Sequence, residues 1–438
     1  MDWNLETEEN ETKKNNKGKK TAKILLVFIV LIFIVMALML FLLYYVNNNT
    51  FRLTIDNKQI NNYASDLIVT DNNVQYISLK DFASLVGYKY HNGEYKEYSQ
   101  DSSKAYVDSM YETASFFLNS NKICKVPPTS GVQEEYEVFT VNDNVKEFNN
   151  KLYASIDAVK IGFNVSIEYT EKKMTVKTLD SLVTAWTADT KEKGYELSTE
   201  FKNQKGILYE YIIARNESKG LYGVYDSKYN ELITPRYSKI EFIENSKEFL
   251  VTTSDNKVGI IDAQGKERIK QIFDSIKLID KDDELYLVSY DQKFGVINKI
   301  GQYIIYPEYE KIGIDSEKYK KNISNNYILL ENFIPVNKNG KWGAFDKTGK
   351  MLLSNIYTEF GCQTINPEIG GEPVIEIEEV GGIVVRNGES YGIYSKEGKE
   401  LIPIALKNVY GITSEGKTTY YMTYNNNQMN VVDYINKN

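Results

Sequence analysis

Acidic residues recur at one position of a motif that repeats along the C-terminal half of this sequence. The motif is an apolar or aromatic residue, a glycine, two small or apolar residues and then an acidic or polar residue. Its last position is occupied in turn by Asp226, Asp262, Asn298, Asp346, Ser395 and Asp433.

A ring of these acids would suit a cation, because hard cations take carboxylate oxygens as ligands. Asn298 and Ser395 at the same position argue against a metal ring, which would want carboxylates throughout. Asp, Asn and Ser side chains also begin turns by accepting hydrogen bonds from nearby backbone amides. We therefore expect these residues to cap turns, and we predict no metal site.

Other reactive side chains lie outside any recognisable motif. The one histidine is His91, and the two cysteines, Cys124 and Cys362, form no CxxC pair. Signatures of phosphate-binding loops, dinucleotide sites, zinc proteases and serine hydrolases are absent from the sequence. We therefore name no catalytic, cofactor-binding or metal-binding residue and expect a protein that is not an enzyme. A cell-envelope hydrolase of the glycosidase type is the alternative, since two carboxylates suffice for that reaction.

The composition favours a folded β protein and argues against a nucleic-acid partner. The 438 residues are enough for two or three domains, each with its own core. The 35 tyrosines favour the half-buried pleated surface of a sheet. The formal net charge is −8, whereas binding to phosphates needs a cationic surface.

An apolar segment near the N-terminus is long enough to cross a membrane. Residues 24–46 are uncharged, and a helix of that length extends over about 34 Å. A signal peptide would have a shorter apolar core followed by a small-residue cleavage site, whereas asparagines follow here. Lysines are concentrated before the span, which predicts a single-pass signal anchor with the disordered tail 1–23 in the cytoplasm. The rest of the chain is then expected outside the cell membrane.

Two stretches between residues 51 and 180 look alike. Each is predicted as a strand that enters a short helix, capped by Ser78 or Ser155 and ended by Gly87 or Gly162. The segments Leu85-Val86-Gly87-Tyr88 and Lys160-Ile161-Gly162-Phe163 resemble the duplicated units of the copper amine oxidase N-terminal-like domain. That resemblance implies an α+β stalk domain of two β-α-β-β-like units over residues 51–180, without oxidase chemistry.

Self-similarity dominates the remainder of the chain. The anchor glycines of the motif are Gly223, Gly259, Gly295, Gly343 and Gly392, and a degenerate sixth copy ends at Asp433. A strand and a polar turn precede each anchor, which is typical of a β-hairpin. A second glycine is expected to adopt positive φ at Gly265, Gly301, Gly349 and Gly398, with Tyr229-Asn230 in its place in the first copy.

The repeated units resemble the WG repeat of bacterial proteins, with Trp342-Gly343 as the consensus form. The resemblance covers residues 205–438, after a linker at 181–204. A unit of three or four short strands cannot bury its apolar face alone and must stack on its neighbours. We expect a mainly β fold with a β-propeller of about six blades, and an open β-solenoid is the alternative.

These features together predict a membrane-anchored, extracytoplasmic bacterial protein that binds a protein or a cell-wall polymer through its β-repeats. Besides the hydrolase, a single-pass surface sensor is an alternative function. The loops of the two longer repeats, Lys311 to Asn332 and Gly361 to Gly381, are the expected specificity elements, because binding residues gather on loops that a scaffold holds.

Overall fold

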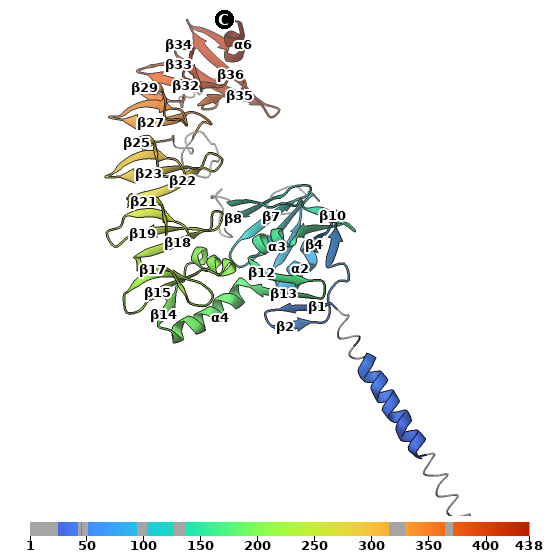
Figure 1. The fold of residues 1–438 in the computed structure, drawn as a ribbon. Coiled ribbons are helices and arrows are strands. Elements are labelled where there is room, and N and C mark those ends of the chain that lie inside the picture. Colours follow the sequence, from blue (N-terminus) through green and yellow to red (C-terminus); the bar gives the residue numbers. More distant parts are fainter. Residues whose placement is uncertain are drawn as a thin grey trace, which may run out of the picture. The chain divides into compact units, whose positions relative to one another are not determined.

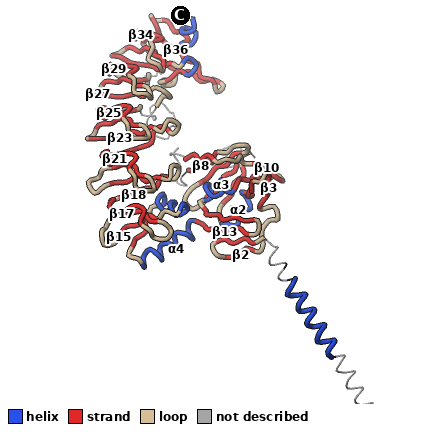
Figure 2. Tube along the Cα trace, viewed as in Figure 1, coloured by secondary structure: helices blue, strands red, loops and turns tan. Residues whose placement is uncertain are grey.

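The computed structural model describes residues 25–42, 45, 51–93, 103–126, 137–314, 329–363 and 371–437. The chain divides into two compact units. The first is Met1–Tyr63 with Ile167–Lys177, and the second is Ala64–Ser166 with Thr178–Asn438. Most of the regular structure is strand, arranged in many small sheets (Figure 1, Figure 2).

The first unit contains an apolar helix and a small sheet. Among the described residues, Leu25–Leu42 is the helix long and apolar enough to cross a membrane. It lies inside the predicted span 24–46, whereas the predicted tail 1–23 lies outside the described residues. The sheet has the order β12-β13-β1-β2, with β1 and β13 parallel. Its strands are β1 (Arg52–Ile55), β2 (Lys58–Ile60), β12 (Val165–Thr170) and β13 (Lys173–Thr178).

The second unit begins with the two predicted strand-to-helix turns, which pair with each other. Strands β4 and β11 are antiparallel neighbours in a sheet of order β10-β11-β4-β3, and each leads directly into a helix. The rings of Phe82 and Phe163 on these helices lie 5.0 Å apart, so the two turns share one core. The elements are β3 (Ile68–Asp71), β4 (Val74–Ser78), α2 (Leu79–Val86), β10 (Lys146–Phe148), β11 (Lys151–Ser155) and α3 (Ile156–Phe163).

Helix α2 begins and ends as its sequence predicts. The hydroxyl of Ser78 accepts a hydrogen bond from the backbone N–H of Asp81, which satisfies one of the free donors of the first turn. Gly87 ends the helix in the left-handed conformation, with a φ of 78°.

Helix α3 departs from the prediction at both ends. Ser155 makes no capping hydrogen bond through its side chain, and the helix continues past Gly162 to end at Asn164, which has a φ of 52°. A Cβ on Gly162 would lie 2.3 Å from the ring of Phe116. Gly162 therefore serves close packing inside the helix, and the expectation that it ends the helix is wrong.

A five-stranded sheet that the sequence patterns did not reveal lies between these two turns in the chain. Its order is β5-β6-β7-β8-β9, and every neighbouring pair is antiparallel. Phe116 on β7 packs against Phe163 of α3, which joins this sheet to the helix. The strands are β5 (Lys89–Asn92), β6 (Lys104–Asp108), β7 (Thr113–Phe117), β8 (Lys122–Val126) and β9 (Glu137–Thr140).

Residues 181–204, expected to form a linker, carry regular structure. They contain most of α4 (Leu179–Glu192), then β14 (Tyr195–Leu197) and α5 (Phe201–Gln204), which leads into the 3-10 helix η1 (Lys205–Tyr209). Strand β14 is the first strand of the first repeat sheet, so the array begins before residue 205.

Six antiparallel sheets follow one another in chain order and form the repeat array (Figure 1). Contacts link each sheet to the next, between β16 and β18, β20 and β22, β24 and β26, β29 and β32, and β34 and β36. The first three sheets contain β14 to β17, β18 to β21 and β22 to β25, with bounds β15 (Ile212–Asn216), β16 (Leu221–Tyr225), β17 (Glu231–Tyr237), β18 (Lys239–Ile243), β19 (Glu248–Thr252), β20 (Val258–Ile261), β21 (Glu267–Phe273), β22 (Ser275–Asp280), β23 (Leu285–Tyr290), β24 (Lys293–Ile297) and β25 (Tyr303–Tyr309). The fourth and fifth contain β26 (Lys311–Ile312), β27 (Ile334–Lys338), β28 (Lys341–Phe345), β29 (Met351–Tyr357), β30 (Glu359–Phe360), β31 (Glu376–Ile377), η3 (Glu378–Val380), β32 (Gly382–Asn387), β33 (Ser390–Ser395) and β34 (Glu400–Leu406).

The anchor glycine of each repeat is required by a close approach within its own sheet. A Cβ on any of the five anchors would lie between 2.6 and 3.0 Å from a carbonyl oxygen of the next strand. The pairing register shifts at the same place in every one of these sheets, as at a β-bulge. The absence of a side chain at the repeated glycine therefore lets the bulged strand approach the backbone of the next strand closely.

The second glycine of each repeat packs against the preceding sheet. Gly265, Gly301, Gly349 and Gly398 adopt the predicted positive φ, between 75° and 88°. A Cβ on Gly349 would lie 2.4 Å from the carbonyl oxygen of Ile304, and one on Gly398 would lie 2.7 Å from that of Leu352. Since Ile304 and Leu352 belong to the last strand of the sheet before, this turn is part of the stacking contact.

In the first repeat, the left-handed position belongs to Tyr229, whose φ is 65°, and not to Asn230. Helix α4 holds the tyrosine in place. The hydroxyl of Tyr229 donates to Asp189 at 2.7 Å. Lys193 Nζ lies 3.4 Å from the centroid of the tyrosine ring, and Trp186 packs against that ring. These contacts offset the roughly 1–2 kcal/mol that the left-handed conformation costs an L-residue.

The sixth sheet differs from the others. It has three strands, β35 (Asn408–Ser414), β36 (Lys417–Tyr424) and β37 (Asn427–Asn430), and is followed by helix α6 (Val431–Lys437). Asp433 lies in the first turn of α6, where its backbone N–H donates to the side chain of Asn430 at 3.0 Å. The prediction that Asp433 caps a turn is therefore wrong, and Asn430 caps the helix.

Candidate functional site

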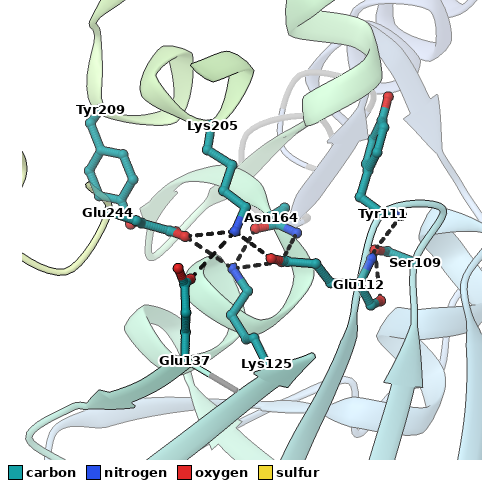
Figure 3. A network of polar contacts seen from close by, with 9 residues as sticks. All are labelled: Ser109, Tyr111, Glu112, Lys125, Glu137, Asn164, Lys205, Tyr209 and Glu244. Atoms are coloured by element: carbon teal, nitrogen blue, oxygen red, sulfur yellow. Dashed lines mark hydrogen bonds and ion pairs between the residues drawn. The ribbon is translucent and has the colours of Figure 1, made fainter. Parts of the chain in front are cut away.

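A group of buried charged residues joins three parts of the second unit (Figure 3). Its members come from the five-stranded sheet, from the end of α3, and from the segments between the first and second strands of the first and second repeat sheets. We call these residues the buried network: Glu112, Lys125, Asn164, Lys205 and Glu244. The charged side chains are between 0% and 9% exposed, so water does not solvate these charges.

The two lysines hold both glutamates. Lys125 Nζ lies 3.0 Å from Glu112 and 3.4 Å from Glu244. Lys205 Nζ contacts the other oxygen of Glu112 and lies 3.0 Å from Glu244. Asn164 completes the set, because its oxygen accepts from Lys125 at 2.7 Å and its nitrogen donates to Glu112 at 2.9 Å. Each buried charge therefore has two opposite charges beside it.

Three further side chains surround the buried network. The hydroxyl of Tyr209 donates to Glu244 at 3.0 Å, and the carboxylate of Glu137 lies 3.8 Å from Lys205 Nζ. The ring of Tyr111 stacks on Phe201 of α5 with centroids 4.4 Å apart. These contacts extend the junction between the five-stranded sheet and the start of the array.

Neighbouring charges decide the protonation of the buried network. Burial opposes ionisation of Glu112, but Lys125 and Lys205 outweigh it, and the pKa of Glu112 falls below its ordinary value of 4.5. Burial also opposes the charge on Lys205, but Glu244 and Glu112 outweigh it, and the pKa of Lys205 rises above its ordinary value of 10.5. Burial and the adjacent Glu244 together raise the pKa of Tyr209.

The buried network is built to hold parts of the fold together. A lysine is a nucleophile only when a lowered pKa frees its amine, and the pKa of Lys205 is raised. A general acid needs a carboxyl that keeps its proton near neutral pH, and the pKa of Glu112 is lowered. The arrangement therefore suits a fixed junction between the five-stranded sheet and the repeat array.

The recurring polar residues of the motif cap turns, as predicted. In each of the five repeats, the side-chain oxygen accepts hydrogen bonds from the backbone N–H groups two and four residues later, at 2.8 to 3.3 Å. The residues are Asp226, Asp262, Asn298, Asp346 and Ser395. Among the described residues, no group of three His, Cys, Asp or Glu side chains is placed to hold a metal ion.

A second recurring device, which the sequence analysis missed, lies at the boundary between consecutive sheets. We call the residue between the last strand of one sheet and the first strand of the next the joint residue. Its side chain binds the hairpin between the second and third strands of the next sheet in every case. The joint residues are Ser238, Asp274, Glu310, Thr358 and Lys407. At two boundaries the joint residue also pairs with a lysine of the preceding sheet, Lys257 with Asp274 at 2.6 Å and Lys293 with Glu310 at 3.2 Å.

Large apolar side chains gather on one part of the array. Beyond residue 45, eight such side chains are exposed among the described residues, and seven of them lie between Ile272 and Ile356. We call these seven the apolar set: Ile272, Leu278, Tyr290, Ile300, Tyr306, Met351 and Ile356. Exposed apolar side chains concentrated in one part of the chain are candidates for a binding surface.

The remaining residues singled out from the sequence do not form a site with these groups. His91 pairs with Asp108 at 3.0 Å, and Cys124 and Cys362 are not joined by a disulfide. Of the two predicted specificity loops, residues 315–328 and 364–370 lie outside the described residues.

The sequence family described as WG containing repeat matches residues 294–319, a segment with the anchor Gly295 and the turn at Gly301. This match supports the resemblance of the array to WG repeats. The resemblance of residues 51–180 to the copper amine oxidase N-terminal-like domain is not supported. Comparison with curated proteins gives no match.

Solved structures share little with the chain in detail. BamB from Moraxella catarrhalis is 10% identical, with a TM-score of 0.20, and the match covers 85% of this chain and 98% of that chain. The WD40 β-propeller domain of Doa1 is 10% identical, with a TM-score of 0.18 and coverage of 73% and 88%. The complex of BBS1N with ARL6DN gives 10% identity, a TM-score of 0.19 and coverage of 73% and 86%. Such scores do not distinguish a closed ring from an open stack, and the chain is similar in sequence to the WG repeat over one segment of its array.

Proposed function

We propose that this chain is a membrane-anchored binding protein that presents a stack of β-sheets outside the cell membrane to a protein or a cell-wall polymer. The apolar set carries the proposal, because seven exposed apolar side chains on three neighbouring sheets are an unusual cost for a surface with no partner. The turn and joint contacts make those sheets a rigid support, which a binding surface needs.

The helix Leu25–Leu42 supports the anchor. Its apolar side chains are exposed in the structure, and a bilayer would cover them. The length of the helix is close to the thickness of the hydrocarbon core, which is about 30 Å. The lysines before it favour a cytoplasmic N-terminus. Protease added to intact cells should then cleave chain beyond residue 51. Complete protection of that region, under conditions that cleave a known surface protein, would contradict the orientation.

For the array we propose an open stack, the alternative to the predicted propeller. Helices lie at both ends of the array: α4 against the first repeat and α6 against the last sheet. Terminal caps are what an open array needs, since its end units have only one neighbour.

The binding proposal favours a non-enzymatic role over the cell-envelope hydrolase. The buried Glu112 is paired to two lysines that lower its pKa, so it does not supply the protonated acid that a glycosidase needs.

Binding through the apolar set can be tested with residues that the repeats themselves supply. Ile272 and Ile356 occupy equivalent positions in β21 and β29, where β17 has Arg236 and β25 has Glu308. The variant I272R/I356E should therefore fold normally and bind envelope material more weakly. Co-sedimentation with purified cell wall and cross-linking to envelope proteins would measure this, with Met110→Ser as the exposed control outside the array. A wild-type chain that binds neither fraction would refute the proposed function.

A further inference from the structure

Three tyrosines of the third repeat sheet lie together at its boundary with the second. Tyr303 and Tyr306 on β25 stack with ring centroids 4.9 Å apart and an angle of 29° between the rings. Tyr303 packs against Phe273, the residue before Asp274, with ring centroids 6.2 Å apart, and Lys257 Nζ lies 5.6 Å from the ring centroid of Tyr290, at the end of β23. Tyr290 is 46% exposed and Tyr306 is 69% exposed. We call these three residues the tyrosine platform.

A polar hollow adjoins the tyrosine platform. It has a volume of about 490 Å³, is open to solvent, and is lined by Tyr290 with Lys257, Asp274, Asp291 and Gln292. The joint residue Asp274 links the lining residues of the hollow. It pairs with Lys257 at 2.6 Å and accepts a hydrogen bond from the backbone N–H of Asp291 at 2.8 Å. The hollow therefore spans two repeats and combines one aromatic wall with charged and amide groups.

The other repeats show that the fold does not require these tyrosines. The position of Tyr306 is taken by Thr234, Lys270, Ser354 and Pro403 in the other repeats, and that of Tyr303 by Glu231, Glu267, Met351 and Glu400. The position of Tyr290, opposite the residue two before the anchor, is taken by Asn216, Thr253, Lys338 and Asn387. Only the third repeat places aromatic rings at all three positions.

The hairpin beside the hollow keeps side chains where its backbone would favour glycine. Asp291 and Gln292 both have positive φ, of 49° and 60°. The same turn in the fourth repeat is Asn339-Gly340, the pair that such two-residue hairpins prefer. A glutamine in this conformation is uncommon and costs stability. It places an amide at the hollow that a glycine would not provide.

We infer that the tyrosine platform and the hollow bind a β-1,4-linked polysaccharide of pyranose sugars. The inference rests on the proposed binding function and names its ligand class. Sugars of this kind carry their polar groups around the ring edge, which leaves two flat faces of C–H bonds that stack on aromatic rings. The hydroxyls of the next sugar reach Asp274, Gln292 and Lys257, and a hollow open at its side lets a polymer continue beyond it.

The charges at the hollow favour a neutral ligand. Lys257 is already paired with Asp274, and Asp291 adds a further negative charge, so the hollow carries no excess of positive charge. A phosphate polymer would need such an excess. A protein partner would be expected to cover the wider apolar set as well, whereas a single polysaccharide strand needs only the platform and the hollow.

The test replaces the tyrosines by residues from the same positions of other repeats. The variant Y290N/Y303E/Y306T takes Asn from the first and fifth repeats, Glu from the first, second and fifth, and Thr from the first. The full chain in detergent micelles would be titrated calorimetrically with chitohexaose, cellohexaose and, as the anionic comparison, inorganic polyphosphate. The wild type should bind at least one hexasaccharide, and the triple variant should bind it at least about tenfold more weakly through loss of stacking. Met110→Ser should bind like the wild type, and circular dichroism should show the same fold for all three.

Equal binding by the wild type and the triple variant would overturn the inference. A wild type that binds neither hexasaccharide, or that prefers polyphosphate, would also overturn it. If that chain still cross-linked to envelope proteins in a manner sensitive to I272R/I356E, the proposed function would stand with a protein as the ligand. A chain that bound no saccharide and no envelope fraction would remove both.

Discussion

At the scale of single residues, the buried network shows how ordinary residue types become a fixed junction. The side chain of Lys205 is 4% exposed and pairs with both Glu112 and Glu244. Those two carboxylates share Lys125 as their other lysine. A buried pair adds little net stability compared with apolar residues, but loss of one partner leaves an uncompensated charge in the interior. The junction should therefore tolerate redesign as a whole and resist single changes.

Lys205→Met tests this asymmetry. The change leaves Glu112 and Glu244 sharing Lys125 alone, and it should lower the free energy of unfolding by about 3–5 kcal/mol. Lys239→Met is the control, since Lys239 pairs with Glu241 at 2.8 Å on the surface and such pairs contribute about 0–1 kcal/mol. Equilibrium urea unfolding measures both. Equal effects of the two substitutions would show that the network does not hold the junction.

The stability of the junction should depend on pH in a defined way. The pKa of Glu112 is lowered, so its contribution is complete above 4.5 and disappears as the pH falls through the folded-state value. The pKa of Lys205 is raised, so its contribution is complete below 10.5 and disappears as the pH rises through its folded-state value. Lys125, Glu137, Glu244 and Tyr209 face the same groups.

Thermal unfolding of the wild type and of Glu112→Gln between pH 3 and pH 8 would show this. The variant should be less stable at neutral pH and should approach the wild type as the pH falls below 4.5. A difference between the two chains that stays constant across that range would contradict the assigned role of Glu112.

The sequence predicted single residues where a short local pattern decides the role. The turn caps and the positive-φ glycines follow from neighbouring backbone groups, so one repeat explains the others. The buried network could not be predicted, because Glu112 and Glu244 are far apart in the chain and glutamate and lysine are common surface residues. Gly162 was assigned the wrong role because its reason for being glycine, the ring of Phe116, comes from a distant strand.

At the scale of elements, the two repeated glycines have different tasks. The anchor glycines permit a bulge within a sheet, whereas the second set permits contact between sheets. Substitutions at the two sets should therefore be detected in different properties, the first in the pairing of one sheet and the second in the stacking of two.

Gly349→Ala tests the stacking contact. The new Cβ would lie 2.4 Å from the carbonyl oxygen of Ile304 at a φ of 88°, and we expect a loss of at least about 2 kcal/mol. Gly340→Ala is the matched control, because it has a φ of 71° but nothing within 4 Å of its Cβ, and should cost about 1 kcal/mol. Hydrogen exchange followed by mass spectrometry should show faster exchange in β25 and β29 for the first variant only. Similar exchange in both variants would refute the contact.

Strands and turns that belong to the repeated motif were predictable from the sequence, and elements outside that motif were not. The strand predicted before each anchor glycine is present in all five repeats. The five-stranded sheet was missed, because its strands are short and only the segments on either side of it carry the recognisable strand-to-helix pattern. Residues 181–204 appeared to be a linker because the first strand of the array carries no anchor motif.

At the scale of the whole molecule, the open stack and the closed ring predict different separations of the ends of the array. Spin labels at Glu217, beside the first sheet, and Glu415, in the last, would report that separation after Cys124 and Cys362 are changed to serine. Both positions are exposed hairpin residues. An open stack should give a long distance by double electron–electron resonance. A short distance would establish the ring and overturn the proposed open stack.

The sequence predicted the kind of repeated unit but not how the series ends. Period and glycine spacing reflect contacts between neighbours, and neighbours contact one another in the same way in a ring and in a stack. The helices that would cap the proposed open stack, α4 and α6, each occur once, so no repeated pattern in the sequence predicts them.

The joint residues have a genetic consequence. Because a joint residue lies at every boundary, a segment running from one joint residue to the next, such as residues 238–273, can be duplicated in frame while Asp274 still follows a sheet that carries Lys257. The array could then lengthen between generations by whole sheets, and the tyrosines of the third sheet would keep the same neighbours.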